Sequence, residues 1–451
     1  MSRFIPVDRQ TDYLLPPSVD EWLPEDHLAR FVVDVVEQLD LSELTREYAG
    51  RGRKAHHPAV LLSLLVYGYA TGVFSSRKIE RATYDSVAFR YLAANTHPDH
   101  DTLATFRRRF LPELEGLFTQ VLVLARQMKL VKLGTIALDG TKLKANASKH
   151  KALSYGHASR VEEQLKAEVQ ALIEHAEAAD RDDATDGMDI PAEIARREQR
   201  LAAIAEAKAE IEARAAERDD AEREAYEAKH AEREAKRQAG KPPRGREPTP
   251  PQTGPREGDQ VNLTDEQSRI MPVTGKGFEQ CYNAQAAVDT DTMLVTYVDV
   301  TQAANDKRQL APLLTGLAEL PPTLGTPTHV LADTGYFSAA NVHHCQSHGI
   351  EPLLAIQRDA HHRPVFERFA PDTPAPETDD PVERMAHRLT TKAGRALYAL
   401  RKHTVEPVFG IIKQVMGFRQ FSLRGLDKVR GEWRLVALSW NIKRMHRLMP
   451  T

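Results

Sequence analysis

The chain has 451 residues, enough for two or three domains and at least one sizeable hydrophobic core. Its two cysteines, Cys281 and Cys345, are too few for a disulfide scaffold or a four-cysteine zinc site, so we expect a reducing, intracellular setting. The first residues contain no apolar run typical of a secretory signal. The most apolar stretch, residues 59–74, is too short to span a bilayer and predicts a buried helix. We therefore expect a cytoplasmic protein without membrane contact.

The formal net charge of −3 conceals two segments of opposite sign. Residues 161–240 contain 23 acidic and 13 basic side chains, whereas residues 383–451 contain 15 lysines and arginines against 4 acidic residues. A basic segment of this density attracts a polyanion, and DNA is the commonest one. A solvated helical surface with arginine-rich faces is the alternative, and charge alone does not separate the two.

Residues 1–130 are predicted to form a helical N-terminal domain. Apolar residues recur at helical spacing over 28–41 and 58–72. Further helices are expected after Ser75, with Arg77 and Lys78 exposed, and after His100, leading to Arg107 and Arg108. Short helices with basic residues near their ends favour a helix-turn-helix-like DNA-binding module. An ordinary helical bundle with surface arginines fits the same pattern.

The sequence pattern changes twice in the middle of the chain. Residues 134–138 form a short β-branched and apolar run that ends on Asp139 and Gly140. Residues 158–239 then predict two long helices folded back as a hairpin, with a break at 186–191 and apolar residues at coiled-coil-like spacing on the second arm. Residues 240–258, rich in Pro, Gly, Arg and Glu, predict a flexible connector.

Residue runs typical of β-strands occur again in the second half of the chain. Residues 281–288 and 293–301 flank a turn at 289–291 and predict a hairpin. Residues 329–332 lead to Asp333, and residues 352–356 supply another short strand. Neither half has enough strands alone, so we expect one α/β domain, made of 131–157 and 259–451, that brackets a helical insertion over 158–258. The tail from about residue 382 is predicted to be helical.

Two of these strands end on an aspartate in the same way. Asp139 precedes Gly140, and Asp333 is followed by Thr334 and Gly335. A carboxylate at a strand end lies on a rigid element, and the nearby glycine permits close approach of a phosphate. Mg²⁺ prefers carboxylate oxygens, and two such ions can assist in-line displacement at phosphorus. Each aspartate taken singly is more often a simple turn residue.

The third candidate carboxylate is Glu406 in the basic tail. Lys413 follows seven residues later, so both side chains are expected on one helical face. Tyr398 and Arg401 lie upstream and extend that face toward a DNA backbone. The simpler interpretations are a first-turn glutamate beside Pro407 and a solvated surface lysine.

At these residues the sequence resembles bacterial insertion-sequence transposases of the DDE type, in the four/five superfamily and its eleven-eighty-two-like branch. The similarity covers nearly the whole chain. It is carried by residues 57–78, ALDGTKLKANAS (137–148), YNAQAAVD (282–289), LADTGYFS (331–338), HTVEPVFGIIK (403–413) and WNIKRM (440–445).

The resemblance implies a ribonuclease H-like catalytic core in which Asp139, Asp333 and Glu406 bind two Mg²⁺ ions, for which Mn²⁺ substitutes. It implies cleavage and strand transfer of double-stranded DNA at terminal inverted repeats and at a target, by a nucleoid-associated homodimer on DNA. The family's tyrosine, arginine and lysine map to Tyr398, Arg401 and Lys413. Because the spacing between Arg401 and Glu406 is one residue longer than the related pattern, Lys402 is a second candidate for the arginine's role.

Three rival interpretations remain open. The chain could be a non-catalytic DNA-binding protein derived from such an enzyme, or a scaffold built on the 158–239 hairpin. If the chain is a transposase, the hairpin is expected to pair protomers rather than to brace DNA, because its net negative charge disfavours close phosphate contact. A zinc site is a weaker rival. It would use His343, His344, Cys345 and His348, with His361 and His362 nearby, whereas surface histidines are the simpler interpretation.

Overall fold

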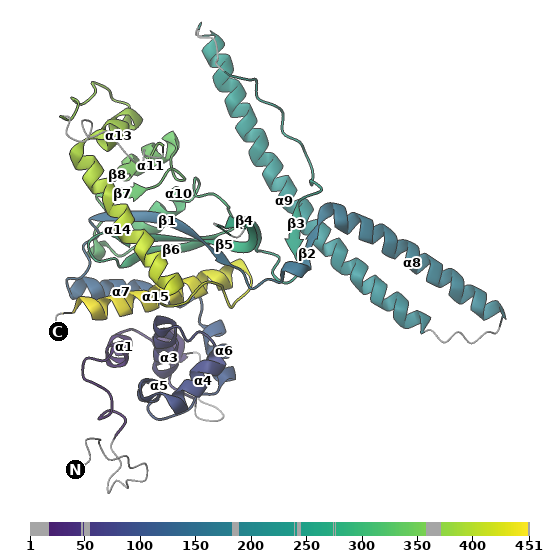
Figure 1. The fold of residues 1–451 in the computed structure, drawn as a ribbon, viewed down its shortest axis with the longest axis horizontal. Coiled ribbons are helices and arrows are strands. Elements are labelled where there is room, and N and C mark those ends of the chain that lie inside the picture. The colour runs from purple at the N-terminus through teal and green to yellow at the C-terminus, as the bar shows by residue number, and fades with distance from the viewer. Residues whose placement is uncertain are drawn as a thin grey trace, which may run out of the picture. The chain divides into compact units, whose positions relative to one another are not determined.

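The computed structural model describes residues 18–46, 48, 55–182, 189–238, 240, 245–273, 275, 277–357 and 371–449 (Figure 1). Contacts divide the chain into two compact units. The sheet unit comprises Met1–Ala145, Met271–Val273 and Cys281–Thr451, and the hairpin unit comprises Asn146–Ile270 and Thr274–Gln280.

A six-stranded mixed sheet organises the sheet unit. Its strands are β1 (Thr135–Lys144), β4 (Arg269–Val273), β5 (Gly277–Asp289), β6 (Val295–Thr301), β7 (His329–Ala332) and β8 (Glu351–Leu354). The order is β4-β5-β1-β7-β8, with β6 also pairing β5. β1 runs antiparallel to β5 and parallel to β7, and β7 runs parallel to β8. The predicted strands at 281–288, 293–301 and 329–332 are thereby confirmed, and the arrangement is consistent with a ribonuclease H-like domain.

The first strand is longer than its sequence pattern predicts. β1 does not end at Asp139 but continues to Lys144, because its pairing with β5 extends from Ile136 opposite Asp289 to Lys144 opposite Cys281. Pairing with β7 covers only Thr135 to Ala137. Asp139 therefore lies within β1, just beyond the point where the neighbouring strand ends.

Seven helices precede the sheet within the described part of the chain. They are α1 (Leu28–Glu37), α2 (Ser42–Arg46), α3 (Pro58–Thr71), α4 (Ser76–Asp85), α5 (Val87–Leu92), α6 (His100–Arg109) and α7 (Leu114–Gln127). α3 is buried on most of its surface, as the apolar stretch at 59–74 predicts. It begins at Pro58 under a cap from the His57 side chain and ends at Gly72, whose φ of 88° is costly for residues with a Cβ.

The C-terminal helix α15 (Leu426–Leu448) joins these helices to the sheet. It packs against β6, α7, α3 and α1. The side chain of Asn441 accepts a hydrogen bond from the backbone N–H of Val295 and donates one to its carbonyl (2.8 and 2.7 Å). The indole of Trp440 donates to the carbonyl of Met293 at 2.9 Å. The WNIKRM segment thus fixes α15 to the start of β6.

These contacts place the N-terminal helices and the sheet in one compact unit, and a DNA-binding domain over residues 1–130 stays a prediction. The physical reason for this single unit is α15, whose buried faces need both partners. The remaining helices of the unit are α10 (Leu310–Ala318), α11 (Ala339–Ser347), α13 (Pro381–Thr390) and α14 (Lys392–Gln414). Figure 1 shows α14 crossing the sheet, and it contacts β1 and β7.

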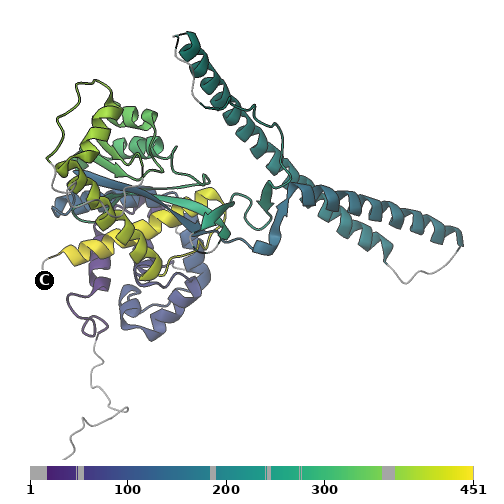
Figure 2. The same ribbon diagram turned by 45° about the horizontal axis from the view of Figure 1, so that its top comes forward.

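The hairpin unit contains two long helices, α8 (Tyr155–Asp182) and α9 (Ile190–Gln238). The first part of α9 lies beside α8, and the rest of α9 extends beyond it (Figures 1 and 2). The predicted helical spacing on the second arm is confirmed, since Ile204, Ala207 and Ile211 are buried. Ion pairs between Arg197 and Glu168 and between Lys208 and Glu162, each at 2.8 Å, connect the helices. The unit begins at Asn146 rather than 158, because β2 (Ala152–Ser154) pairs with β3 (Gln260–Asn262) at its base.

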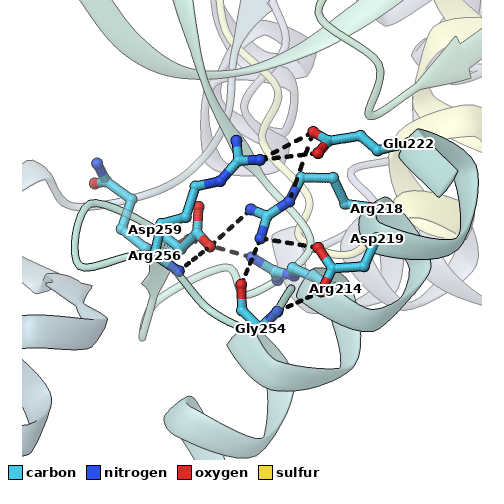
Figure 3. Close-up of polar contacts among 8 residues, drawn as sticks. Arg214, Arg218, Asp219, Glu222, Gly254, Arg256 and Asp259 are labelled. Carbon is cyan, nitrogen blue, oxygen red and sulfur yellow. Dashed lines mark hydrogen bonds and ion pairs between the residues drawn. The ribbon is translucent and has the colours of Figure 1, made fainter. Parts of the chain in front are cut away.

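The connector is held more firmly than its composition predicts. In its described part, residues 245–258 and the adjoining Asp259 return along α9 and are tied to it by charged side chains (Figure 3). Arg218 pairs with Asp259 at 2.7 Å and donates to the carbonyl of Gly254 at 2.8 Å. Arg256 pairs with Glu222 at 2.9 Å. Composition alone did not reveal these partners because they lie more than thirty residues apart.

Among the described helices, none by itself has the length and apolar composition to cross a membrane. The pair α3 and α4 meets that test only when joined across a bend of 96°.

Candidate active site and its acidic cluster

Asp139, within β1, and Asp333, the residue that follows β7, lie at the same level of two neighbouring parallel strands. Ala137 pairs with Leu331, so residues two positions further along each strand, Asp139 and Asp333, come side by side. Neighbouring strands are about 4.8 Å apart. Asp333 also contributes to the electrostatic environment of Asp139. The topology therefore unites two predicted carboxylates that are far apart in the sequence.

Glu406 joins this pair through an arginine. It lies within α14 rather than in a first helical turn. The guanidinium of Arg401 contacts Asp139 Oδ2 at 3.4 Å and Glu406 Oε1 at 3.0 Å. The Arg401 side chain is only 11% exposed, whereas that of Glu406 is 49% exposed. Arg401 thus bridges the buried and the accessible members of the predicted triad.

Burial dominates the electrostatics of Asp139. Burial raises its pKa to about 7, the cation Arg401 opposes that rise, and the neighbouring Asp333 and Asp306 add to it. Carboxylates gathered in one place with a single arginine disfavour one another's charged forms. A further cation at this point would relieve that repulsion.

A divalent ion fits the chemistry of these donors, because hard cations prefer carboxylate oxygens. Within the described residues, no three His, Cys, Asp or Glu side chains are yet arranged as ligands of one ion. Arg401 pairs with both Asp139 and Glu406 and so stands between them. Its charge also interacts with Asp333, so this one arginine senses all three carboxylates.

The sequence interpretation missed Asp306. It lies in the loop after β6 and accepts hydrogen bonds at 2.7 Å from both Asn283 and Gln285, two buried amides of β5. A Cβ on Gly140 would come within 2.5 Å of Asp306 Oδ1, so only glycine lets Asp306 approach β1 here. The available signal was the YNAQ segment, whose two amides interrupt an otherwise apolar buried strand.

The basic residues predicted around Glu406 differ in their surroundings. Lys413 is half-buried and donates to Thr141 and to the carbonyl of Lys142, and burial lowers the pKa of its ammonium. It therefore fastens α14 to β1 rather than standing free on a surface. Lys402 is exposed and Tyr398 is half-buried, near Arg401.

The four basic residues predicted in the N-terminal helices also divide into two groups. Arg77 and Lys78 are exposed in the first turn of α4, and Arg108 is exposed on α6. Arg107 turns inward and donates to the Tyr69 hydroxyl and to the Phe74 carbonyl, both at 3.1 Å. These contacts favour a structural role for Arg107.

The histidine-rich segment forms part of α11. Cys345 is buried, which raises the pKa of its thiol to about 12 and disfavours the thiolate that binds metals. Of the candidate ligands, His361 and His362 lie outside the described residues. Among the residues that are described, this segment contains no group of ligand side chains placed for a metal ion.

Comparison with known families gave two matches. A model described as the transposase DDE domain matches residues 248–442, and one described as a transposase domain (DUF772) matches residues 17–109. Asp333 and Glu406 lie inside the first match, and Asp139 lies between the two. Searches for similar curated proteins and for similar solved structures gave no match. From the mixed sheet, the gathered carboxylates and these two matches, we conclude that the chain belongs to the DDE transposases of insertion sequences.

Proposed function

We propose that this protein cleaves double-stranded DNA at the terminal inverted repeats of its element and transfers the freed 3′ ends into target DNA. Asp139, Asp333 and Glu406 are proposed to hold two Mg²⁺ ions, with Mn²⁺ as a substitute. What supports the proposal is that Asp139 and Asp333 lie side by side and that Arg401 pairs with both Asp139 and Glu406. The DDE domain match supports transposase activity, and neither match favours a non-catalytic DNA-binding derivative.

When bound, the two ions would activate the attacking oxygen and stabilise the leaving oxygen of an in-line displacement. The chain's own residues prepare that site. Asp139 holds a proton below about pH 7 and must release it to act as an anionic ligand. Arg401 keeps Asp139 and Glu406 together by pairing with both, and its displacement would free their oxygens for ligation.

Helices α3 and α4 are proposed to bind the element ends as a helix-turn-helix. They are separated by four residues beginning with Gly72 and meet at a bend of 96°, within the usual range for that motif. Arg77 and Lys78 are exposed at the start of the second helix, where a recognition helix contacts DNA. Arg77→Ala and Lys78→Ala should each weaken DNA binding and lower the salt dependence of log Kd by about 1. Arg46→Ala, also exposed but paired with Glu43, is the control.

The catalytic proposal is tested with DNA duplexes that carry the element's terminal repeats, in the presence of Mg²⁺ or Mn²⁺. Asp139→Asn, Asp333→Asn and Glu406→Gln should each lower the cleavage rate by at least about 100-fold, because each removes one anionic ligand. Binding of the duplex in a gel-shift assay should persist. Asp291→Asn, an exposed residue in the β5–β6 turn, is the charge-matched control. Cleavage by Asp139→Asn at the wild-type rate would refute the assignment.

Paired DNA ends and placement in the eleven-eighty-two-like branch are part of the same proposal. A homodimer is expected on DNA, and the hairpin unit is the proposed pairing element. Light scattering of the protein with and without an end duplex tests this, with deletion of the hairpin unit as the comparison. A nucleoid-associated, cytoplasmic location follows from the proposed substrate.

A further inference from the structure

Two polar segments of the chain are not used by the three-carboxylate site. The YNAQ segment places Asn283 and Gln285 in the buried strand β5, and the TGY segment places Tyr336 beyond β7. Buried amides and hydroxyls are retained only where hydrogen bonds compensate for lost hydration. The hydrogen-bond partners of these three side chains therefore indicate what the side chains do.

The side chains of Asn283, Gln285 and Tyr336 form one hydrogen-bond network that ends at Asp306. The Tyr336 hydroxyl donates to Gln285 Oε1, and the Gln285 amide donates to Asp306 Oδ1 at 2.7 Å. Asn283 donates to the same oxygen at 2.7 Å and to the carbonyl of Ala303 at 3.1 Å. These contacts fix the orientation of the Asp306 carboxylate. They use only Oδ1 as an acceptor and leave Oδ2 available.

The second oxygen of Asp306 faces Asp333. Oδ2 lies 3.6 Å from the point where a Cβ on Gly335 would stand, and Asp333 Oδ1 lies 2.9 Å from the same point. Within the part of the chain that is described, Oδ2 accepts no hydrogen bond. Two carboxylate oxygens thus flank one small space that is kept open by a glycine.

An independent observation points to a ligand beside Asp306, on the side of its carboxylate that faces Gly140. Asn283 is fully buried, yet its Oδ1 has no hydrogen-bond partner among the described residues. This oxygen lies 2.9 Å from the Cβ position of Gly140, beside Asp139. An orphaned buried acceptor is costly, and a hydrated divalent cation supplies the missing donor through its waters.

We propose that Asp306 is a fourth carboxylate ligand of the divalent-ion site, binding through Oδ2 together with Asp333. Asn283, Gln285 and Tyr336 are positioning residues that hold it there. The inference rests on the proposed function, because it assumes that the acidic cluster binds Mg²⁺ or Mn²⁺. It extends the site beyond the three carboxylates that the sequence pattern indicates.

The test is titration of Mn²⁺ at pH 8 into the full chain, with free Mn²⁺ measured by electron paramagnetic resonance. Asp306→Asn can still accept both amide hydrogen bonds through its oxygen while placing an NH₂ group at the Oδ2 position. We expect it to weaken Mn²⁺ binding about 10- to 100-fold. Asp139→Asn should weaken binding as well, and Asp291→Asn should bind as the wild type does.

Gly335→Ala provides a second variant if Asp306→Asn does not fold. Its methyl group would occupy the space between the two oxygens without changing any charge, and the same loss of affinity is expected. Tyr336→Phe should cause a smaller loss, of a few-fold, because it releases only the far end of the hydrogen-bonded chain.

The outcomes separate the two proposals. Weakened binding in both Asp306→Asn and Gly335→Ala supports a ligand role. Wild-type affinity in Asp306→Asn, combined with a loss in Asp139→Asn, overturns the role of Asp306 and leaves the three-carboxylate site intact. A wild-type protein that binds no Mn²⁺ overturns both.

Discussion

Asp139→Asn should stabilise the protein in the absence of divalent ions, although it is expected to abolish cleavage. The pKa of Asp139 rises from 3.8 in the unfolded chain to about 7 in the folded protein, chiefly through burial. A carboxyl group whose pKa is raised by folding stabilises the folded state most at low pH. That contribution is lost as the pH rises from about 4 to about 7. Asparagine keeps the shape and the acceptor for the Gly140 N–H but carries no charge.

The magnitude follows from the size of the shift. At about 1.4 kcal/mol per pKa unit, ionised Asp139 costs the folded state up to about 4 kcal/mol above pH 7. The difference in unfolding free energy between variant and wild type should therefore widen by about 2–3 kcal/mol between pH 5 and pH 8. Above about pH 8 this difference should stay constant, because Asp139 is then ionised in both the folded and the unfolded wild-type protein.

Urea denaturation followed by tryptophan fluorescence measures this difference. All three tryptophans, Trp22, Trp433 and Trp440, belong to the sheet unit, so the signal reports that unit. Adding Mg²⁺ at pH 8 should stabilise the wild type and narrow the difference, because an ion that binds only the folded state adds stability. A difference that does not change with pH, or a variant less stable than the wild type at pH 8, would refute the reasoning.

Three further results are expected. Asn441→Leu should lower the free energy of unfolding by about 2–5 kcal/mol in the same urea assay, because it leaves the buried N–H and carbonyl of Val295 unpaired; an unchanged midpoint would contradict this. Gly140→Ala should cost about 1–3 kcal/mol and reduce cleavage, because its methyl group collides with the side chains of Gln285 and Asp306; full activity would argue against the close approach. Arg218→Ala should accelerate proteolysis within residues 245–258 without moving the tryptophan transition, and an unchanged cleavage pattern would show that its ion pair does not hold the connector.

The sequence by itself was enough to predict many of the elements and to nominate three carboxylates. Helical spacing located α3 and the core-facing residues of α9, and the two strand-like runs that flank the turn at 289–291 located β5 and β6. The strand at 329–332 and its terminal Asp333 were equally visible. A residue pattern of this kind indicates which face of one element is buried, but not which other element packs against that face.

Only the tertiary structure decided which distant groups meet. Pairing with β5 carries β1 past Asp139, and the parallel register with β7 sets Asp333 beside it. Arg401 comes between Asp139 and Glu406, and Asp306 enters through the space left by Gly140. The YNAQ segment signals a buried polar partner without identifying it as Asp306. The connector is held by ion pairs across more than thirty residues. Such contacts depend on long-range packing and on charges that share a low-dielectric environment. The spacing of neighbouring residues in the sequence predicts neither.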